Sequence, residues 1–173
     1  IWKNWKMPEL SIELCRARQS RLRDALQNLN AERAILTSPE NVQWLTGFRP
    51  HHWMSATVCL EPNGECVLIA PNEEPEKHAA DRVITFEAQW LCTLRQDQMA
   101  AIAEQLPEST VPTAIEFSNT GPHIRHKAGE QIVNLEPAIL KLRRNKDEDE
   151  LALMRKAIDC TDAMYRKARE IIE

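Results

Sequence analysis

The chain has 173 residues, of which 22 are Lys or Arg and 26 are Asp or Glu, and its formal net charge is −4. This length fits one domain of ordinary size with an appended helix, and the scatter of basic residues among acidic ones argues against binding to nucleic acid. No apolar run approaches the roughly 20 residues of a membrane span, and the first residues lack the apolar centre of a signal peptide. We therefore expect a soluble, cytoplasmic protein that does not bind membranes.

Apolar periodicity predicts short strands alternating with helices. In chain order we expect a helix over 9–29, a strand over 34–37, a short helix from Pro39, strands over 56–60 and 66–70, a short helix over 73–80, a strand over 82–86, a helix over 94–105, a strand over 113–117, a helix over 122–128, a strand over 131–135, a helical turn over 136–142 and a long final helix. The strand-helix-strand units favour parallel pairing, and the hairpin signal at Asn63-Gly64 favours antiparallel pairing. The prediction is an α/β fold, a three-layer domain with a mixed β-sheet between helices, plus a C-terminal helix.

The hairpin also bears on the cysteines. A two-residue turn at Asn63-Gly64 would place Cys59 opposite Leu68 and Cys66 opposite Glu61. The five cysteines are odd in number and include no C-x-x-C pair. Reduced thiols packed as small core residues are therefore expected, in agreement with an intracellular protein.

The stretch from Thr37 to Phe48, T-S-P-E-N-V-Q-W-L-T-G-F, compresses a strand end, a short helix and a glycine stop into twelve positions. Ser38 and Pro39 are typical of a helix start, and Gly47 can adopt the left-handed conformation that ends a helix. The loop that follows is rich in cationic and aromatic side chains, which a ligand site needs and a plain connector does not. The candidate site residues are Phe48, Arg49, His51, His52 and Trp53. The alternative is that Trp53 only packs at the start of the next strand.

Two other clusters could be mistaken for metal sites. His123 and His126 have helical i, i+3 spacing, but Arg125 and Lys127 beside them repel a cation, so a surface helix is expected. The acidic run 147–150 lacks the glycine and oxygen spacing of a calcium loop. We expect it to be a solvated helix start, in which Asp147 and Glu150 have capping-box spacing.

The final helix carries a narrow apolar stripe, whose members alternate three and four residues apart. They are Leu151, Met154, Ile158, Thr161, Tyr165, Ala168 and Ile172. A stripe of this kind needs a partner, either the domain itself or a further domain.

Two segments resemble a known family. The stretch S-P-E-N-V-Q-W-L-T-G-F is similar to one in the N-terminal domain of the creatinase and prolidase family, the Xaa-Pro peptidases, with Trp44 where tyrosine is common. The segment L-R-R-N-K-D-E-D-E-L-A-L-M-R-K-A, from Leu142 to Ala157, resembles the run that joins this domain to the catalytic one. The resemblance implies a ribonuclease H-like topology for residues 1–142. It also implies that residues 143–173 form the linker and the first helix of a pita-bread catalytic domain outside this chain.

The resemblance also implies a function. In the family, two divalent metal ions (manganese, cobalt or zinc) are held by the catalytic domain, so this fragment would have no catalytic residue, no metal ligand and no cofactor of its own. The chain would be a non-catalytic N-terminal domain of a prolidase-like metallopeptidase. It would contribute contacts to a homodimer and cap the partner's active site, with Phe48 as an apolar wall and Arg49 meeting the carboxylate of a proline-containing peptide. Two alternatives remain open: a binding module of a catalytically dead member, as in a histone chaperone, or the same domain of a creatinase or lyase.

Overall fold

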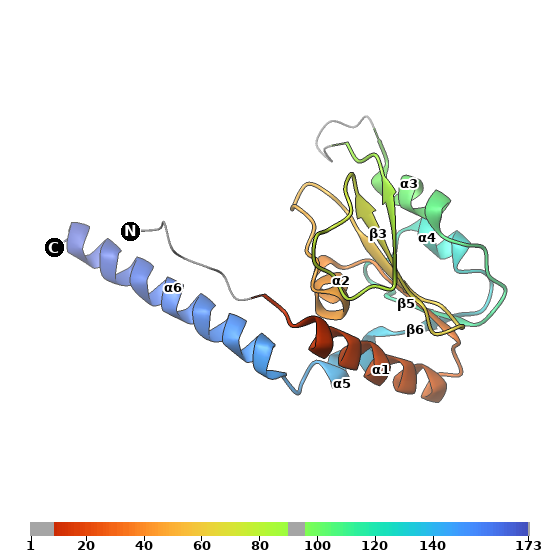
Figure 1. Ribbon diagram of the computed structural model, residues 1–173, viewed down its shortest axis with the longest axis horizontal. Helices are drawn as coiled ribbons and strands as arrows, with labels where there is room; N and C mark the ends of the chain where they lie inside the picture. Colours follow the sequence, from red (N-terminus) through yellow and green to blue (C-terminus); the bar gives the residue numbers. More distant parts are fainter. Residues whose placement is uncertain (1–8, 90–95, 173) are drawn as a thin grey trace.

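A six-stranded sheet with helices on both faces forms the body of the protein, and one long helix projects from it (Figure 1). The computed structural model describes residues 9–89 and 96–172. The helices are α1 (Ile12–Asn28), α2 (Pro39–Thr46), α3 (Gln98–Gln105), α4 (Pro122–Lys127), α5 (Glu136–Leu142) and α6 (Glu148–Ile172). The strands are β1 (Arg33–Leu36), β2 (Thr57–Leu60), β3 (Cys66–Pro71), β4 (Arg82–Phe86), β5 (Thr113–Ile115) and β6 (Ile132–Asn134).

The strand order is β4-β3-β2-β1-β5-β6, and the sheet is mixed as predicted. The pairs β1–β2 and β2–β3 are antiparallel, whereas β3–β4, β1–β5 and β5–β6 are parallel. Strand β1 is central, with β2 on one side and β5 on the other. The predicted α/β fold with a C-terminal helix is confirmed.

Two apolar cores cover the two faces of the sheet. Because successive side chains of a strand point to opposite faces, Ala34 and Leu36 join a core with side chains from α1, α2 and α5. Ile35, between them, joins a second core with side chains from α3 and α4. Strand β1 is buried at every position, which explains why its residues after Arg33 are a continuous apolar run rather than an alternating one.

The helix expected over 73–80 does not form. Pro75 is the third of these eight residues, and a proline disfavours helical backbone in the residue before it, which is Glu74. The backbone bonds instead to neighbouring elements: the N–H of Ala79 donates to the carbonyl of Thr46, and the N–H of Asp81 to the carbonyl of Cys66, both at 2.8 Å. The segment is therefore an irregular connection held down by long-range bonds.

The hairpin between β2 and β3 has a different register from the expected one. Cys59 pairs with Val67 and Leu60 with Cys66, because the N–H of Glu61 donates to the carbonyl of Glu65 across a three-residue loop. Gly64 has a φ of 92°, the left-handed position that such a loop requires. The register changes, but the thiols of Cys15, Cys59, Cys66 and Cys160 are free as predicted, whereas Cys92 lies outside the described residues.

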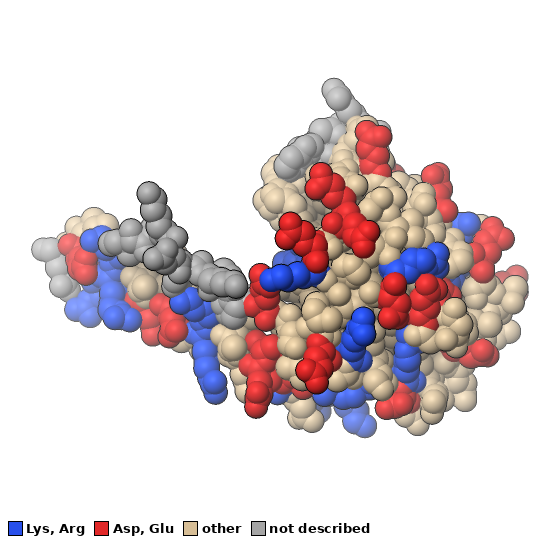
Figure 2. Space-filling model, in the orientation of Figure 1, with Lys and Arg blue, Asp and Glu red and all other residues tan. Residues whose placement is uncertain are grey.

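The distribution of surface charge and the apolar character of the helices agree with the composition. On the face drawn in Figure 2, Lys and Arg side chains lie among Asp and Glu side chains, so that face carries no continuous basic surface. None of the helices in the described ranges combines the length and the apolar character needed to cross a bilayer. The predicted helix start at residue 94 lies outside the described residues. Helix α3 is described from Gln98, where the Asp97 side chain accepts from two backbone N–H groups.

Candidate functional site

The predicted site loop, residues 48–53, joins α2 to β2 at the surface. The His51 and His52 side chains are exposed and Trp53 is half-buried. The ring centroids of His51 and His52 are 4.1 Å apart, and those of His52 and Trp53 are 5.3 Å apart. The structure thus brings three of the predicted residues into one aromatic row.

A buried glutamine fixes the far end of this loop. Gln98, at the start of α3, is 1% exposed. Its Nε2 donates to the carbonyl of Trp53 at 3.2 Å, and its Oε1 accepts from the N–H of Ser55 at 2.6 Å. The exposed rings therefore stand on a backbone anchored to the core.

Arg49 folds back on α2. Its guanidinium donates to Gln43 Oε1 at 3.1 Å and to Glu40 Oε1 at 3.0 Å, and the side chains of Arg49 and Glu40 are 50% and 54% exposed. A backbone hydrogen bond and the Arg49 guanidinium lower the pKa of Glu40. An ion pair this exposed contributes little stability, so a ligand carboxylate can compete for the guanidinium.

Phe48 differs from the rest of the loop. It is half-buried and packs against the core formed by α1, α2 and α5. Its N–H donates to Thr46 Oγ1 at 3.1 Å, next to Gly47, whose φ of 77° ends α2. Phe48 therefore packs on the core, whereas Arg49, His51 and His52 are exposed.

A buried carboxylate organises the loop between β1 and α2. Glu116, at the end of β5, is 3% exposed. It accepts from the N–H of Thr37 (2.5 Å), the N–H and Oγ of Ser38 (2.9 and 2.5 Å) and Nδ2 of Asn41 (2.5 Å). Asn41 Oδ1 in turn accepts from Nη1 of Arg143, beyond α5, at 2.6 Å. This network joins the carboxyl ends of β1 and β5 to the segment that leads into α6.

A groove of about 770 Å³ lies above this network. Ser38, Asn41 and Glu116 contribute to its floor, Ile139 and Leu140 of α5 to one wall, and Arg143, Arg144 and Lys146 to its rim. No local pattern in the sequence predicts the groove, because its residues come from segments that only the fold brings together.

The acidic run at the start of α6 is not a solvated helix start, and that prediction is wrong. Arg18 of α1 is fully buried, and its Nε donates to Asp147 at 2.9 Å. Its Nη2 donates to Asp149 and lies 3.6 Å from Glu150. The three carboxylates are 17%, 8% and 11% exposed. They pair with Arg18 because the start of α6 docks beside α1.

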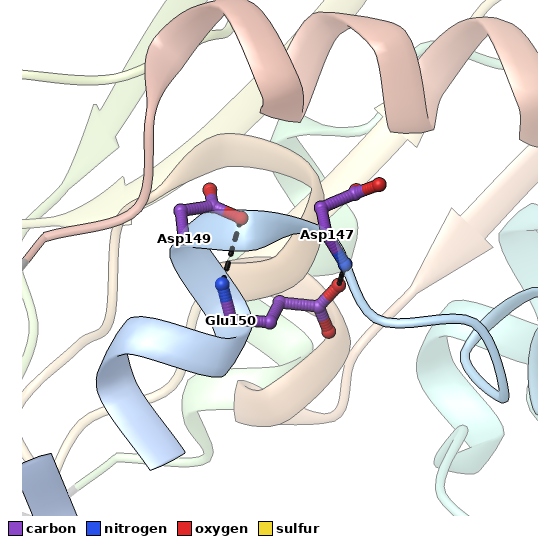
Figure 3. Close-up of side chains that lie close together, drawn as sticks. All are labelled: Asp147, Asp149 and Glu150. Carbon is purple, nitrogen blue, oxygen red and sulfur yellow. Dashed lines mark hydrogen bonds between the residues drawn. The ribbon is translucent and has the colours of Figure 1, made fainter. Parts of the chain in front are cut away.

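The capping arrangement of this run is confirmed in part (Figure 3). The N–H of Asp147 donates to Glu150 Oε2 at 3.1 Å, which is the Glu half of a capping box. The Asp147 side chain bonds to Arg18 and Arg21 instead of the helix backbone. An arginine at a core-facing position of α1, between Cys15 and Leu22, was the signal in the sequence that could have revealed this pairing.

The same three carboxylates form the one cluster of three or more possible metal ligands in the described ranges. The guanidinium of Arg18 already contacts all three carboxylates, and Arg21 also pairs with Asp147, so this donor set does not fit a divalent cation. His123 faces Asp97 at 3.2 Å with both side chains exposed, which is the surface helix that was expected.

Comparison with known proteins decides the family. Residues 18–144 match the family described as the Creatinase/Prolidase N-terminal domain. The chain belongs to this family. The creatinase/prolidase domain is 27% identical over 155 residues to an uncharacterized peptidase of Staphylococcus aureus strain bovine RF122, and the match covers 83% of this chain and 41% of the relative. The chain therefore spans about two fifths of the curated relatives it matches.

Solved structures share the fold of this creatinase/prolidase domain. The N-terminal domain of an X-Pro dipeptidase from Streptococcus pyogenes aligns with a TM-score of 0.54 and 21% identity, over 72% of this chain and 98% of that one. Prolidase from Pyrococcus furiosus aligns with a TM-score of 0.67 and 19% identity, over 89% of this chain and 46% of that one. The recognised family and fold are confirmed.

Proposed function

We propose that this chain is the non-catalytic N-terminal domain of a cytoplasmic, homodimeric Xaa-Pro metallopeptidase, in which it contributes dimer contacts and helps to close the active site over a proline-containing peptide. The observation that carries the proposal is the family membership over residues 18–144. The names of the similar proteins support it, since they include an uncharacterized peptidase, an X-Pro dipeptidase and a prolidase.

Helix α6 supports a neighbouring domain. Met154, Ile158 and Tyr165 of its apolar stripe are 49%, 58% and 70% exposed, and no residue of α6 is buried within the described chain. Figure 1 shows α6 extending away from the sheet. The structural match rises from 72% of the chain for the domain-only dipeptidase structure to 89% for the longer prolidase. In the proposal, α6 is the first helix of the catalytic domain, which covers the stripe.

The metal chemistry belongs to that neighbouring domain. Two divalent ions, manganese, cobalt or zinc, would activate water for attack on the peptide carbonyl there. The residues described in this chain supply no donor set that fits such an ion, because Arg18 occupies the only acidic cluster of three. The contribution of this chain is to bind and enclose the substrate.

Arg49, His51, His52 and Trp53 would form the part of the cap that reaches the partner's substrate. Arg49 is held by an exposed ion pair with Glu40 and a hydrogen bond to Gln43, so it can exchange Glu40 for a substrate carboxylate, which its planar guanidinium binds with two hydrogen bonds. Phe48 would support the loop from below.

The test is Arg49→Ala in the full-length dimer, assayed with Xaa-Pro dipeptides and manganese. We expect kcat/KM to fall by about 10- to 100-fold, the range for a lost charge-assisted hydrogen bond, with metal content and melting temperature unchanged. Arg82→Ala is the matched control, since Arg82 on β4 is exposed to a similar extent and forms an ion pair with Glu65. Phe48→Ala should lower the melting temperature, because it removes core contacts.

Two outcomes contradict parts of the proposal. Unchanged kcat/KM for Arg49→Ala would reject the role of this loop in closing the active site and leave dimer contacts as the role of the domain. A full-length protein that cleaves no Xaa-Pro peptide with any of the three metals would reject the peptidase assignment as a whole.

A further inference from the structure

We propose that the groove between the carboxyl ends of β1 and β5 and helix α5 binds a small organic carboxylate. This inference does not depend on the peptidase proposal, because it rests only on the shape and chemistry of the groove. The parts that carry it are a polar floor (Ser38, Asn41, Glu116), an apolar wall (Leu140) and a cationic rim (Arg144, Lys146).

The position of the groove is one that open α/β sheets offer to ligands. The chain leaves β1 through α2 and continues to β2 on one side, whereas it leaves β5 through α4 and continues to β6 on the other. Helices α2 and α4 pack on opposite faces of the sheet. Connections that diverge in this way open a crevice outside the carboxyl ends of the two strands. Its volume, about 770 Å³, is in the range of small-molecule sites.

The floor is rigid before any ligand arrives. Glu116 is fixed by the donors of Thr37, Ser38 and Asn41, and Asn41 is fixed by Arg143. Preorganised polar groups of this kind lower the entropy lost when a ligand binds.

The rim and the wall define the ligand class. The Lys146 ammonium donates to the carbonyl of Arg143, which holds it at the rim. Arg144 is exposed, and its guanidinium has no hydrogen bond or ion pair with any residue in the described ranges. Leu140, which lines the groove, is 67% exposed, so its side chain offers apolar surface to a ligand. An anion attached to an apolar body satisfies both features.

A carboxylate fits better than a phosphate. Phosphate sites at the end of a strand use the backbone N–H groups that open the next helix. Here the N–H groups of Thr37 and Ser38 already donate to Glu116. The negative charge of Glu116 on the floor also repels a dianion more strongly than a monoanion. The groove therefore favours a single negative charge at the rim with apolar contact along α5.

The test is a titration of the chain with 4-methylpentanoate, followed by backbone amide chemical shifts. We expect saturable shifts that cluster at Ser118, Asn119, Glu136 and Leu140, and no such shifts with the neutral 4-methylpentanamide. Arg144→Gln should weaken binding by about five-fold, and Lys141→Gln should change it by less than about two-fold. Lys141 is the matched control because it is an exposed cation three residues before Arg144, on α5, and does not line this groove.

Each contrary result overturns the inference. Equal binding of the amide would remove the role of charge, and scattered shifts without saturation would show that no site exists. Tighter binding of isobutyl phosphate than of 4-methylpentanoate would assign the groove to phosphate esters instead. Equal losses in Arg144→Gln and Lys141→Gln would reduce the effect to general surface charge.

Discussion

Glu116 is the residue whose surroundings say most about how this domain is held together. Its carboxylate accepts from backbone and side-chain donors of Thr37, Ser38 and Asn41, and it stands where the first turn of α2 needs an acceptor. Ser38 makes no side-chain cap of its own because its hydroxyl donates to Glu116. A residue far along the chain thus performs the capping that the local sequence appeared to assign to Ser38.

We expect Glu116→Gln to destabilise the protein by about 2 to 3 kcal/mol, because an amide presents a donor to groups that are themselves donors and leaves some of them unsatisfied. The measurement is the free energy of unfolding in urea. Glu130→Gln, which neutralises an exposed carboxylate, is the control and should change it by less than about 0.5 kcal/mol. Equal changes in unfolding free energy for the two substitutions would show that the hydrogen bonds of Glu116 add no stability beyond that of an exposed carboxylate.

Asp147 gives the protein a pH dependence. The hydrogen bond from Arg21, and then the one from Arg18, lower its pKa. Because the folded pKa lies below the unfolded value of about 3.9, ionised Asp147 stabilises the fold above that pH, and the contribution is lost as the pH falls through the folded pKa. We expect Arg21→Gln to make unfolding stability less steeply dependent on pH below about 4. Arg16→Gln, at an exposed position of the same helix, should leave the slope unchanged, and the effect should shrink in high salt.

Helix α6 is an element with two different halves. Its first turn is clamped to α1 by Arg18, and the N–H of Ser11 also donates to Asp149 at 2.9 Å. Its later turns carry the exposed apolar residues Met164, Tyr165 and Ile171. The first turn is therefore fixed by this domain, whereas the rest of α6 is largely exposed and, in the proposal, is covered by the neighbouring domain.

We expect amide hydrogen exchange to follow this division. In a monomeric sample, the amides of 160–172 should exchange much faster than those of β1 to β3, and concentration-dependent protection would indicate that two stripes pair. Protection of 160–172 equal to that of the sheet in a strict monomer would contradict this view.

Removing the ion pairs between Arg18 and the start of α6 should affect both α6 and the stability of the whole domain. Arg18→Met leaves Asp149 and Glu150 without a counter-charge and Asp147 with Arg21 alone, and we expect a loss of about 3 kcal/mol in unfolding free energy together with faster exchange at the start of α6. Arg16→Met on the exposed face of α1 is the control. If Arg18→Met were neutral, the ion cluster would not be what fixes α6.

At the scale of the whole molecule, the described residues form a packed domain that carries an exposed loop. The domain provides two apolar cores, a rigid sheet and a surface loop, and the described residues provide no open metal-ligand set. This arrangement suits a domain that encloses a site formed elsewhere.

The chain should therefore bind no catalytic metal. We expect calorimetric titration with manganese to show no saturable binding, and treatment with a chelator to leave the melting temperature unchanged, since a ligand that binds only the folded state would raise it. Micromolar affinity, or a lower melting temperature after chelation, would contradict the absence of a metal site.

The sequence by itself determined the elements and the family. The apolar run of β1, the Ser38-Pro39 start and Gly47 stop of α2, and the stripe of α6 are local patterns, and each describes an element whose residues are neighbours in the chain. The mixed sheet was also predicted from local patterns, namely the hairpin signal at Asn63-Gly64 and the strand-helix-strand spacing. The loop of Arg49, His51 and His52 was found in this way, although its role stays a prediction.

Only the tertiary structure decided the features that join distant segments. The β2–β3 loop has three residues instead of the expected two, and its length is set by the pairing of β2 with β3. Segment 73–80 is irregular because its backbone bonds to other elements, as in the hydrogen bond from the N–H of Ala79 to the carbonyl of Thr46. The burial of Glu116 could not be read from its neighbours, and the core-facing position of Arg18 did not identify its partners, because a charged residue is buried only where a partner from elsewhere compensates for its lost hydration. That partner lies 129 residues away for Arg18 and Asp147, and 78 residues away for Glu116 and Ser38. Local periodicity carries no information about such pairs. The ion pairs of Arg18 with the start of α6 and the groove beside α5 are therefore visible only in the folded chain.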